Sequence, residues 1–152
     1  MALTLGAAPA ARADMQADRD LCSSSKPQIA IPNCTLVIKD RTQPPDVRAL
    51  ALSNRGFASQ SIGEVDDAIA DYDAAIKIVL GAGIGRHGPT AKLLAKTYVN
   101  RGVAYGMRDN PTQALKDYDA ALALDPGLDS ARYNRAMLLA DRPKPAPAAP
   151  PR

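Results

Sequence analysis

The sequence predicts an all-α fold built from repeated helical hairpins. Two short blocks each occur twice at matching places: N-R-G at 54–56 and 100–102, and D-Y-D-A-A at 71–75 and 117–121. Around these blocks, bulky and small residues recur at helical spacing. Prolines stand where such helices would begin or end. The 152 residues are therefore expected to form one domain in which a helix–turn–helix unit is repeated.

The second copy carries the fuller pattern. It has Y-x2-R-G-x2-Y from Tyr98, A-x3-Y from Ala114, and a final proline at Pro126. This pattern resembles the tetratricopeptide repeat, a unit of about 34 residues with the consensus W-x2-L-G-x2-Y, A-x3-F and a closing Pro. Tyr98 stands where the family has Trp, and Arg101 where it has Leu. The resemblance implies an α-solenoid whose first helices line a concave surface.

Residues 2–11 form an apolar stretch rich in alanine, and Ala11-Arg12-Ala13 is similar to a signal-peptide cleavage site. The positively charged start of such a signal is missing. Two interpretations stay open. Either residues 1–13 are a signal peptide and the chain is periplasmic or secreted, or they are an Ala-rich tail on a cytoplasmic protein.

Cys22 and Cys34 are the two cysteines of the chain. In an exported protein such a pair favours a disulfide, and two unrelated thiols are the alternative. Ala30, Cys34 and Ile38 share one helical face, as in the second helix of a repeat that lacks its partner. Pro32 would then have to lie in the first turn of this helix. A cysteine-bearing leader helix of this kind resembles those of small exported bacterial repeat proteins.

The first full repeat begins at Pro44-Pro45 and has Leu80 where the closing proline should stand, so its second helix is expected to run on. A Gly-rich loop and a helix start at Pro89 then lengthen the first helix of the next repeat. Asn110 is expected to cap the helix that follows. From the N-terminus, the predicted segments are a signal peptide (1–13), a cysteine-containing segment with a half-repeat (14–43), a first repeat (44–82), an insertion (83–94), a second repeat (95–128), a capping helix (129–140) and a Pro/Ala-rich disordered tail (141–152).

Several classes of function are not indicated. Gly83-x-Gly85-x2-Gly88 matches a dinucleotide fingerprint in form, but that fingerprint needs a preceding strand, and a helix is expected here. No cofactor is therefore expected. No metal is expected either, because no second group of Cys or His residues lies near Cys22 and Cys34. The net charge of +3 is dispersed, without the basic run typical of nucleic-acid binding. No apolar run reaches the length of about 18 residues that spans a membrane. With one histidine and no base near either cysteine, an enzyme is not expected.

The predicted function is protein–protein interaction, through a peptide or partner helix bound in the concave groove. The alternative is a structural subunit that self-associates through the same groove, which another copy or its own tail would fill. Asn54, Asn100 and Asn134 recur at matching places and would form a ladder along this surface. Such a ladder could bind a peptide backbone, because an amide offers both donors and acceptors. A purely structural role for these Asn residues is equally open. The candidate partner-binding residues are Asn54, Phe57, Asn100, Val103, Met107, Tyr133, Asn134 and Met137. Arg55 and Arg101 are expected to pair with Asp71 or Asp73 and with Asp117 or Asp119, tying helices together.

Overall fold

The computed structural model describes residues 9–85 and 87–140, with side chains from residue 14 onward. Every regular element in these ranges is an α-helix, which confirms the predicted fold class. The expected disordered tail and most of the expected signal peptide lie outside the described residues. The helices are α1 (Pro9–Cys22), α2 (Pro27–Lys39), α3 (Pro45–Ser61), α4 (Val65–Gly81), α5 (Gly88–Met107), α6 (Pro111–Leu124) and α7 (Asp129–Ala140).

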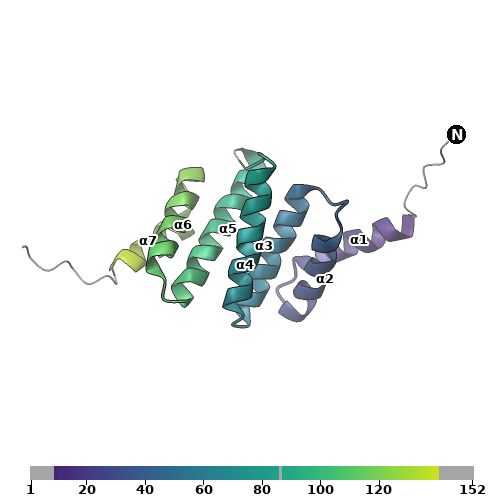
Figure 1. Ribbon diagram of the computed structural model, residues 1–152, viewed down its shortest axis with the longest axis horizontal. Coiled ribbons are helices and arrows are strands. Elements are labelled where there is room, and N and C mark those ends of the chain that lie inside the picture. Colours follow the sequence, from purple (N-terminus) through teal and green to yellow (C-terminus); the bar gives the residue numbers. More distant parts are fainter. Residues whose placement is uncertain (1–8, 86, 141–152) are drawn as a thin grey trace, which may run out of the picture.

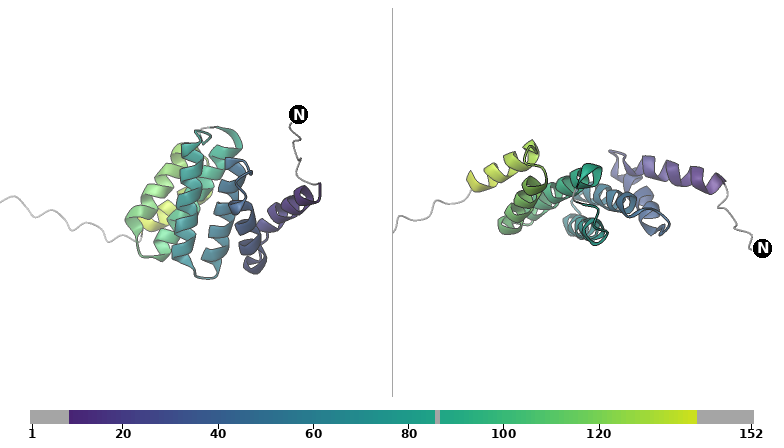
Figure 2. Two further views of the ribbon diagram at one scale, coloured as in Figure 1. Left: turned by 45° about the vertical axis from the view of Figure 1, so that its right-hand side comes forward. Right: turned by 90° about the horizontal axis from the view of Figure 1, so that it is seen from above.

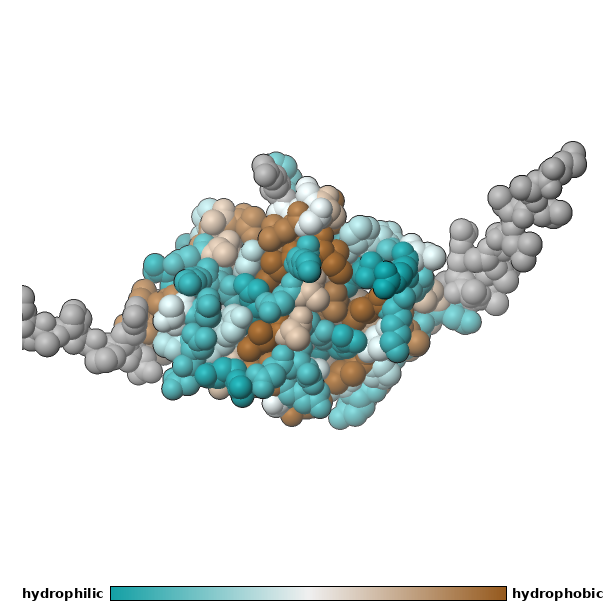
Figure 3. Space-filling model, viewed as in Figure 1, coloured by the Kyte–Doolittle hydropathy of each residue, from teal (hydrophilic) through white to brown (hydrophobic). Residues whose placement is uncertain are grey.

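The helices form a row of antiparallel hairpins, α1–α2, α3–α4 and α5–α6, followed by α7 (Figure 1). Each second helix packs against the first helix of the next hairpin, and the first helices α1, α3, α5 and α7 also touch in sequence. Seen from above, the row is curved, and these first helices lie on its inner side (Figure 2). The outer face gathers apolar side chains over the middle of the row, among polar ones (Figure 3).

Glycine allows the two helices of a hairpin to approach closely. A Cβ atom added at Gly102 would come within 2.6 Å of Cε1 of Tyr118, and one added at Gly56 within 2.9 Å of Cε1 of Tyr72. Both tyrosines are buried. The aromatic ring of the second helix therefore rests on the glycine of the first helix, in the same way in both hairpins.

Arginines join successive second helices. Arg101 donates to Asp117 from Nε at 2.8 Å and from a terminal nitrogen at 2.6 Å, and also to Asp73 of the preceding hairpin at 2.5 Å. Arg55 holds Asp71 in the same two-bond fork and donates to Thr35 of α2. Each arginine thus bridges its own second helix and the preceding one, which confirms its predicted structural pairing.

The remaining acidic residue of the predicted set, Asp119, pairs with Arg135 of α7 at 2.6 Å and not with Arg101. This pair repeats the pairing of Arg101 with Asp73, in which an arginine of a first helix bonds an aspartate of the preceding second helix. Arg101 is the most enclosed of these cations. Burial alone would lower the pKa of its guanidinium, but the hydrogen bonds and charges of Asp117 and Asp73 raise it above the ordinary value, so the group stays charged.

The helix ends follow the predicted signals. Asn110 caps α6 by accepting a hydrogen bond from the backbone N–H of Gln113, and Pro111 opens that helix. The second helix of the first repeat does run on: α4 has 17 residues where α6 has 14. Pro89 lies in the first turn of α5, whose 20 residues make it longer than the 17-residue α3. The predicted insertion is thus partly loop and partly helix.

The N-terminal segment differs from the predicted half-repeat because α2 has a partner, α1, packed against it. The predicted disulfide is present: Cys22 at the end of α1 is bonded to Cys34 of α2, with Cα atoms 4.6 Å apart. Both cysteines are buried in a small core with Val37 and Ala51. The disulfide therefore fixes the end of α1 on α2 and against the first residues of the repeat array.

The expectation that Pro32 lies in the first turn of its helix is wrong, because α2 begins at Pro27 and Pro32 is inside it. A proline here removes the hydrogen bond that would reach back to Gln28. Gln28 and Pro32 are both exposed, so water can donate a hydrogen bond to the carbonyl group of Gln28. The next residue, Asn33, donates from its side chain to the carbonyl oxygen of Ile29 at 2.7 Å, a local side-chain bond to the helix backbone.

Candidate functional site

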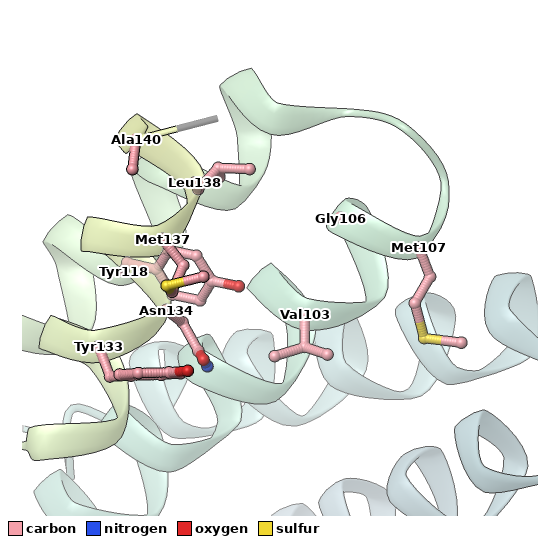
Figure 4. Close-up of a pocket in the computed structure, with 9 residues that line it drawn as sticks. All are labelled: Val103, Gly106, Met107, Tyr118, Tyr133, Asn134, Met137, Leu138 and Ala140. Atoms are coloured by element: carbon pink, nitrogen blue, oxygen red, sulfur yellow. The ribbon is translucent and has the colours of Figure 1, made fainter. Parts of the chain in front are cut away.

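A groove of about 800 Å³ lies between α5 and α7 on the inner side of the curve. It collects five of the eight candidate residues predicted from the sequence. Figure 4 shows that they come from facing helices, with Val103 and Met107 on α5 and the others on α7. The complete lining is Val103, Gly106, Met107, Tyr118, Tyr133, Asn134, Met137, Leu138 and Ala140.

The rim of this groove is unusually apolar for exposed surface. Tyr133 is 65% exposed, Met137 55% and Met107 54%. Large apolar side chains that cluster around a hollow typically mark an interaction site. Methionine adapts its shape to different partners, and tyrosine offers both an apolar ring and a polar tip.

The floor of the groove contains Tyr118, which is not among the candidate residues predicted from the sequence. In the hairpin α3–α4, the hydroxyl of Tyr72 donates to Oε1 of Gln60 at 3.0 Å. Gly106 occupies the place of Gln60 in the hairpin α5–α6, so the hydroxyl of Tyr118 has no such acceptor. Tyr118 is only 4% exposed, and within residues 14–85 and 87–140 its hydroxyl makes no hydrogen bond. Figure 4 shows this hydroxyl directed toward the space between α5 and α7.

The hydroxyl of Tyr118 is suited to donate a hydrogen bond at any ordinary pH. Burial raises the pKa of the phenol, and the neighbouring Asp117 carboxylate raises it further. The group therefore keeps its proton. The hydroxyl oxygen of Tyr118 is open to the groove and is not fully buried. An occupant of the groove with a free carbonyl oxygen would take the place of solvent as its acceptor.

The comparison with known protein families agrees with this geometry. Residues 95–128, which span most of α5, all of α6 and the turn before α7, match the family model described as Tetratricopeptide repeat. The chain carries a tetratricopeptide repeat. The matched residues are the predicted second repeat. Among curated proteins, none matches the chain. Tetratricopeptide repeats typically build non-enzymatic scaffolds, and the match supports a general role in protein–protein interaction.

The hairpin α3–α4 repeats the tetratricopeptide geometry outside the matched residues. Gly56 lies under Tyr72, and Arg55 holds Asp71, as in the matched repeat. Its sequence departs from the pattern at Ser59 and Leu80, where the family has an aromatic residue and proline. The packing positions are thus kept in both hairpins, although Ser59 and Leu80 depart from the family pattern.

The other three candidate residues do not line the groove. Asn54 of α3 lies beside α1, where its side-chain nitrogen is 3.9 Å from Sγ of Cys22. Asn100 is half-buried on α5, and Phe57 is exposed on α3. The three Asn residues therefore have different surroundings, and Asn134 alone among them lies in the groove between α5 and α7.

A second hollow, of about 350 Å³, lies between the N-terminal halves of α3 and α5. Its walls include Leu50 and Leu93, with Lys92 and Lys96 at the edge. Pro89 and Thr90, from the extra turn at the start of α5, complete it. The inserted residues thus extend the inner surface. In the described part of the chain, no helix is long and apolar enough to cross a membrane, and no cluster of three metal-ligating side chains is found.

Proposed function

We propose that the protein is an interaction scaffold that binds an extended peptide segment, or a helix, of a partner protein in the groove between α5 and α7. One observation carries the proposal: exposed Met107, Tyr133 and Met137 line the same groove as Tyr118, whose hydroxyl makes no hydrogen bond within the described residues. The apolar rim would supply affinity through burial, and Tyr118 with Asn134 would fix the position of the bound backbone.

Peptide selection tests this function directly. Peptides from a displayed random library are selected on the immobilised chain, and the affinity of the best one is measured by fluorescence anisotropy. We expect Met137→Glu to weaken binding at least tenfold, because a charge would be buried against the ligand. Leu36→Glu is the matched control, since Leu36 is as exposed as Met137 but lies on α2. Equal loss in both variants would refute groove binding.

A second candidate is self-association through the same groove, and the surface of α7 favours it. Ala131 is the one residue of α7 that is buried, while Tyr133, Met137 and Leu139 are exposed. A second copy could cover this helix. Light scattering over a range of protein concentrations separates the two candidates: a dimer that Met137→Glu dissociates supports self-association, and a monomer at all concentrations contradicts it.

We also infer that the protein works in an oxidising compartment, the periplasm or outside the cell. The disulfide between Cys22 and Cys34 supports this location, because such bonds are rare in the cytoplasm. Intact-mass measurement on protein from its native host tests the inference. A mature chain that begins at Asp14, with both cysteines oxidised, would support it. A chain that retains residues 1–13, with two free thiols, would place the protein in the cytoplasm.

A further inference from the structure

We propose that residues 141–152 of the chain dock in the groove between α5 and α7 as an extended proline-rich segment, and that Tyr118 donates a hydrogen bond to one of its backbone carbonyl oxygens. The inference rests on the proposed function, because both use this groove as a peptide site. It adds an occupant from the chain itself, which a partner would have to displace.

The chemistry of the segment matches the polar groups of the groove. Residues 141–152 contain five prolines, at 143, 145, 147, 150 and 151. Proline has no backbone N–H, and a polyproline II segment makes no internal hydrogen bonds, so it presents mostly carbonyl acceptors. A site for such a segment must therefore offer donors. The hydroxyl of Tyr118 and the side-chain amide of Asn134 are donors that face the groove.

The apolar part of the groove suits proline rings. Proline-rich segments are bound in grooves lined by aromatic side chains, where the preformed polyproline II shape lowers the entropic cost of binding. Tyr133 supplies an exposed aromatic ring, and Met107 and Met137 supply adaptable apolar surface on the two sides. The segment has no large apolar residue of its own, so it needs only shallow apolar contacts of this kind.

The position of the segment favours docking within one molecule. Ala140, the residue directly before it, already lines the groove. A polyproline II chain extends about 3.1 Å per residue, so six residues reach roughly 19 Å. Cα atoms of α5 and α7 come within 8 Å of each other at their contact, so the segment can turn back from the end of α7 and reach α5. Short covalent connection gives an effective concentration in the millimolar range, which makes even weak docking populated.

Methionine methyl spectra of the full chain test the docking. The natural chain is compared with a variant of the same length in which each tail proline is changed to glycine, from Pro143→Gly to Pro151→Gly. We expect the methyl signals of Met107 and Met137 to move, because the segment contacts them. The signal of Met15 is an internal control, since Met15 packs in the N-terminal core. Unchanged signals for Met107 and Met137 would overturn the proposal.

Two further comparisons sharpen this test. Tyr118→Phe should lower the equilibrium constant for docking by about threefold to tenfold, as expected for the loss of one hydrogen bond. Tyr72→Phe is the matched control, since the Tyr72 hydroxyl is bonded to Gln60 in the other repeat. Equal effects of the two changes would refute the role of Tyr118.

The differences in the methyl signals of Met107 and Met137 should survive dilution of the protein. Differences that vanish on dilution would assign the segment to a second copy and overturn docking within one molecule.

The glycine variant also keeps this inference separable from the proposed function. Its groove is free of the natural segment, so a library-selected peptide should bind it more tightly than it binds the natural chain. An unchanged methyl spectrum together with peptide binding would refute the docking of the segment but would still support the scaffold function. Absence of peptide binding to either protein would instead remove the scaffold function.

Discussion

Gly102 lies against the ring of Tyr118, so closely that a Cβ atom on residue 102 would stand 2.6 Å from Cε1. We predict that Gly102→Ala lowers the free energy of unfolding by about 1–3 kcal/mol, because the ring must move within a packed hairpin. In an open helical site the same change would stabilise by about 0.5–1 kcal/mol. Urea unfolding, monitored by circular dichroism, shows whether the free energy of unfolding falls or rises.

Gly106→Ala is the control for this prediction. Gly106 lies one turn further along the same helix, and a Cβ atom there would meet nothing within 4 Å. We expect this change to raise the free energy of unfolding by roughly 0.5–1 kcal/mol. If both changes raise stability, the contact with Tyr118 does not constrain residue 102, and the close approach of α5 and α6 has another cause.

A second prediction concerns Arg101. Removing its side chain in Arg101→Ala leaves the buried carboxylate of Asp117 without its two charged hydrogen bonds, and Asp73 without its partner. Breaking a buried ion pair from one side typically costs about 3–5 kcal/mol. The exposed pair of Arg108 and Asp66 provides the comparison, and Arg108→Ala should change stability by roughly 0.5 kcal/mol or less. Similar losses in both variants would contradict the bridging role of Arg101.

The hairpins could be predicted from sequence because close packing leaves a signal at fixed spacing. Gly102 and Tyr118 must occupy matched positions for α5 and α6 to approach, and Gly56 and Tyr72 repeat the pair. The helix α1 left no comparable signal. Its sequence is dominated by small and polar residues, and much of what holds its end in place is the bond from Cys22 to Cys34. Contacts of this kind depend on tertiary structure and not on a local pattern.

The candidate site was predictable only in part for the same reason. Tyr133 and Met137 could be placed on the inner surface from the repeat spacing alone. The free hydroxyl of Tyr118 depends on the residue opposite it, which is Gly106 where the other repeat has Gln60. The covered position of Asn54 depends on α1, whose presence the sequence did not indicate. Equal spacing therefore predicted one Asn ladder where the structure has three different surroundings.

A third prediction concerns the disulfide. Replacing both cysteines, in Cys22→Ala with Cys34→Ala, should lower the free energy of unfolding by about 3 kcal/mol on the chain-entropy account of a short closed loop. Alanine is chosen because both sites are buried and a serine hydroxyl would add its own cost. Urea midpoints are compared under oxidising and reducing conditions. The natural chain should lose stability on reduction and the double variant should not; a natural chain that is indifferent to reduction would show that the bond does not stabilise the array.

The last prediction separates the three Asn residues by their surroundings. Asn134→Ala should weaken binding of a library-selected peptide by about twofold to tenfold, since it removes a donor from the groove, and should leave the urea midpoint unchanged. Asn54→Ala should do the reverse, lowering stability by roughly 0.5–1.5 kcal/mol with no effect on affinity, because Asn54 packs against Cys22 beside α1. Asn100→Ala serves as the reference, since Asn100 lies on α5 outside the groove. A common loss of affinity in all three variants would instead restore one continuous Asn ladder as the binding surface, and the peptide would then have to run along α3, α5 and α7 together.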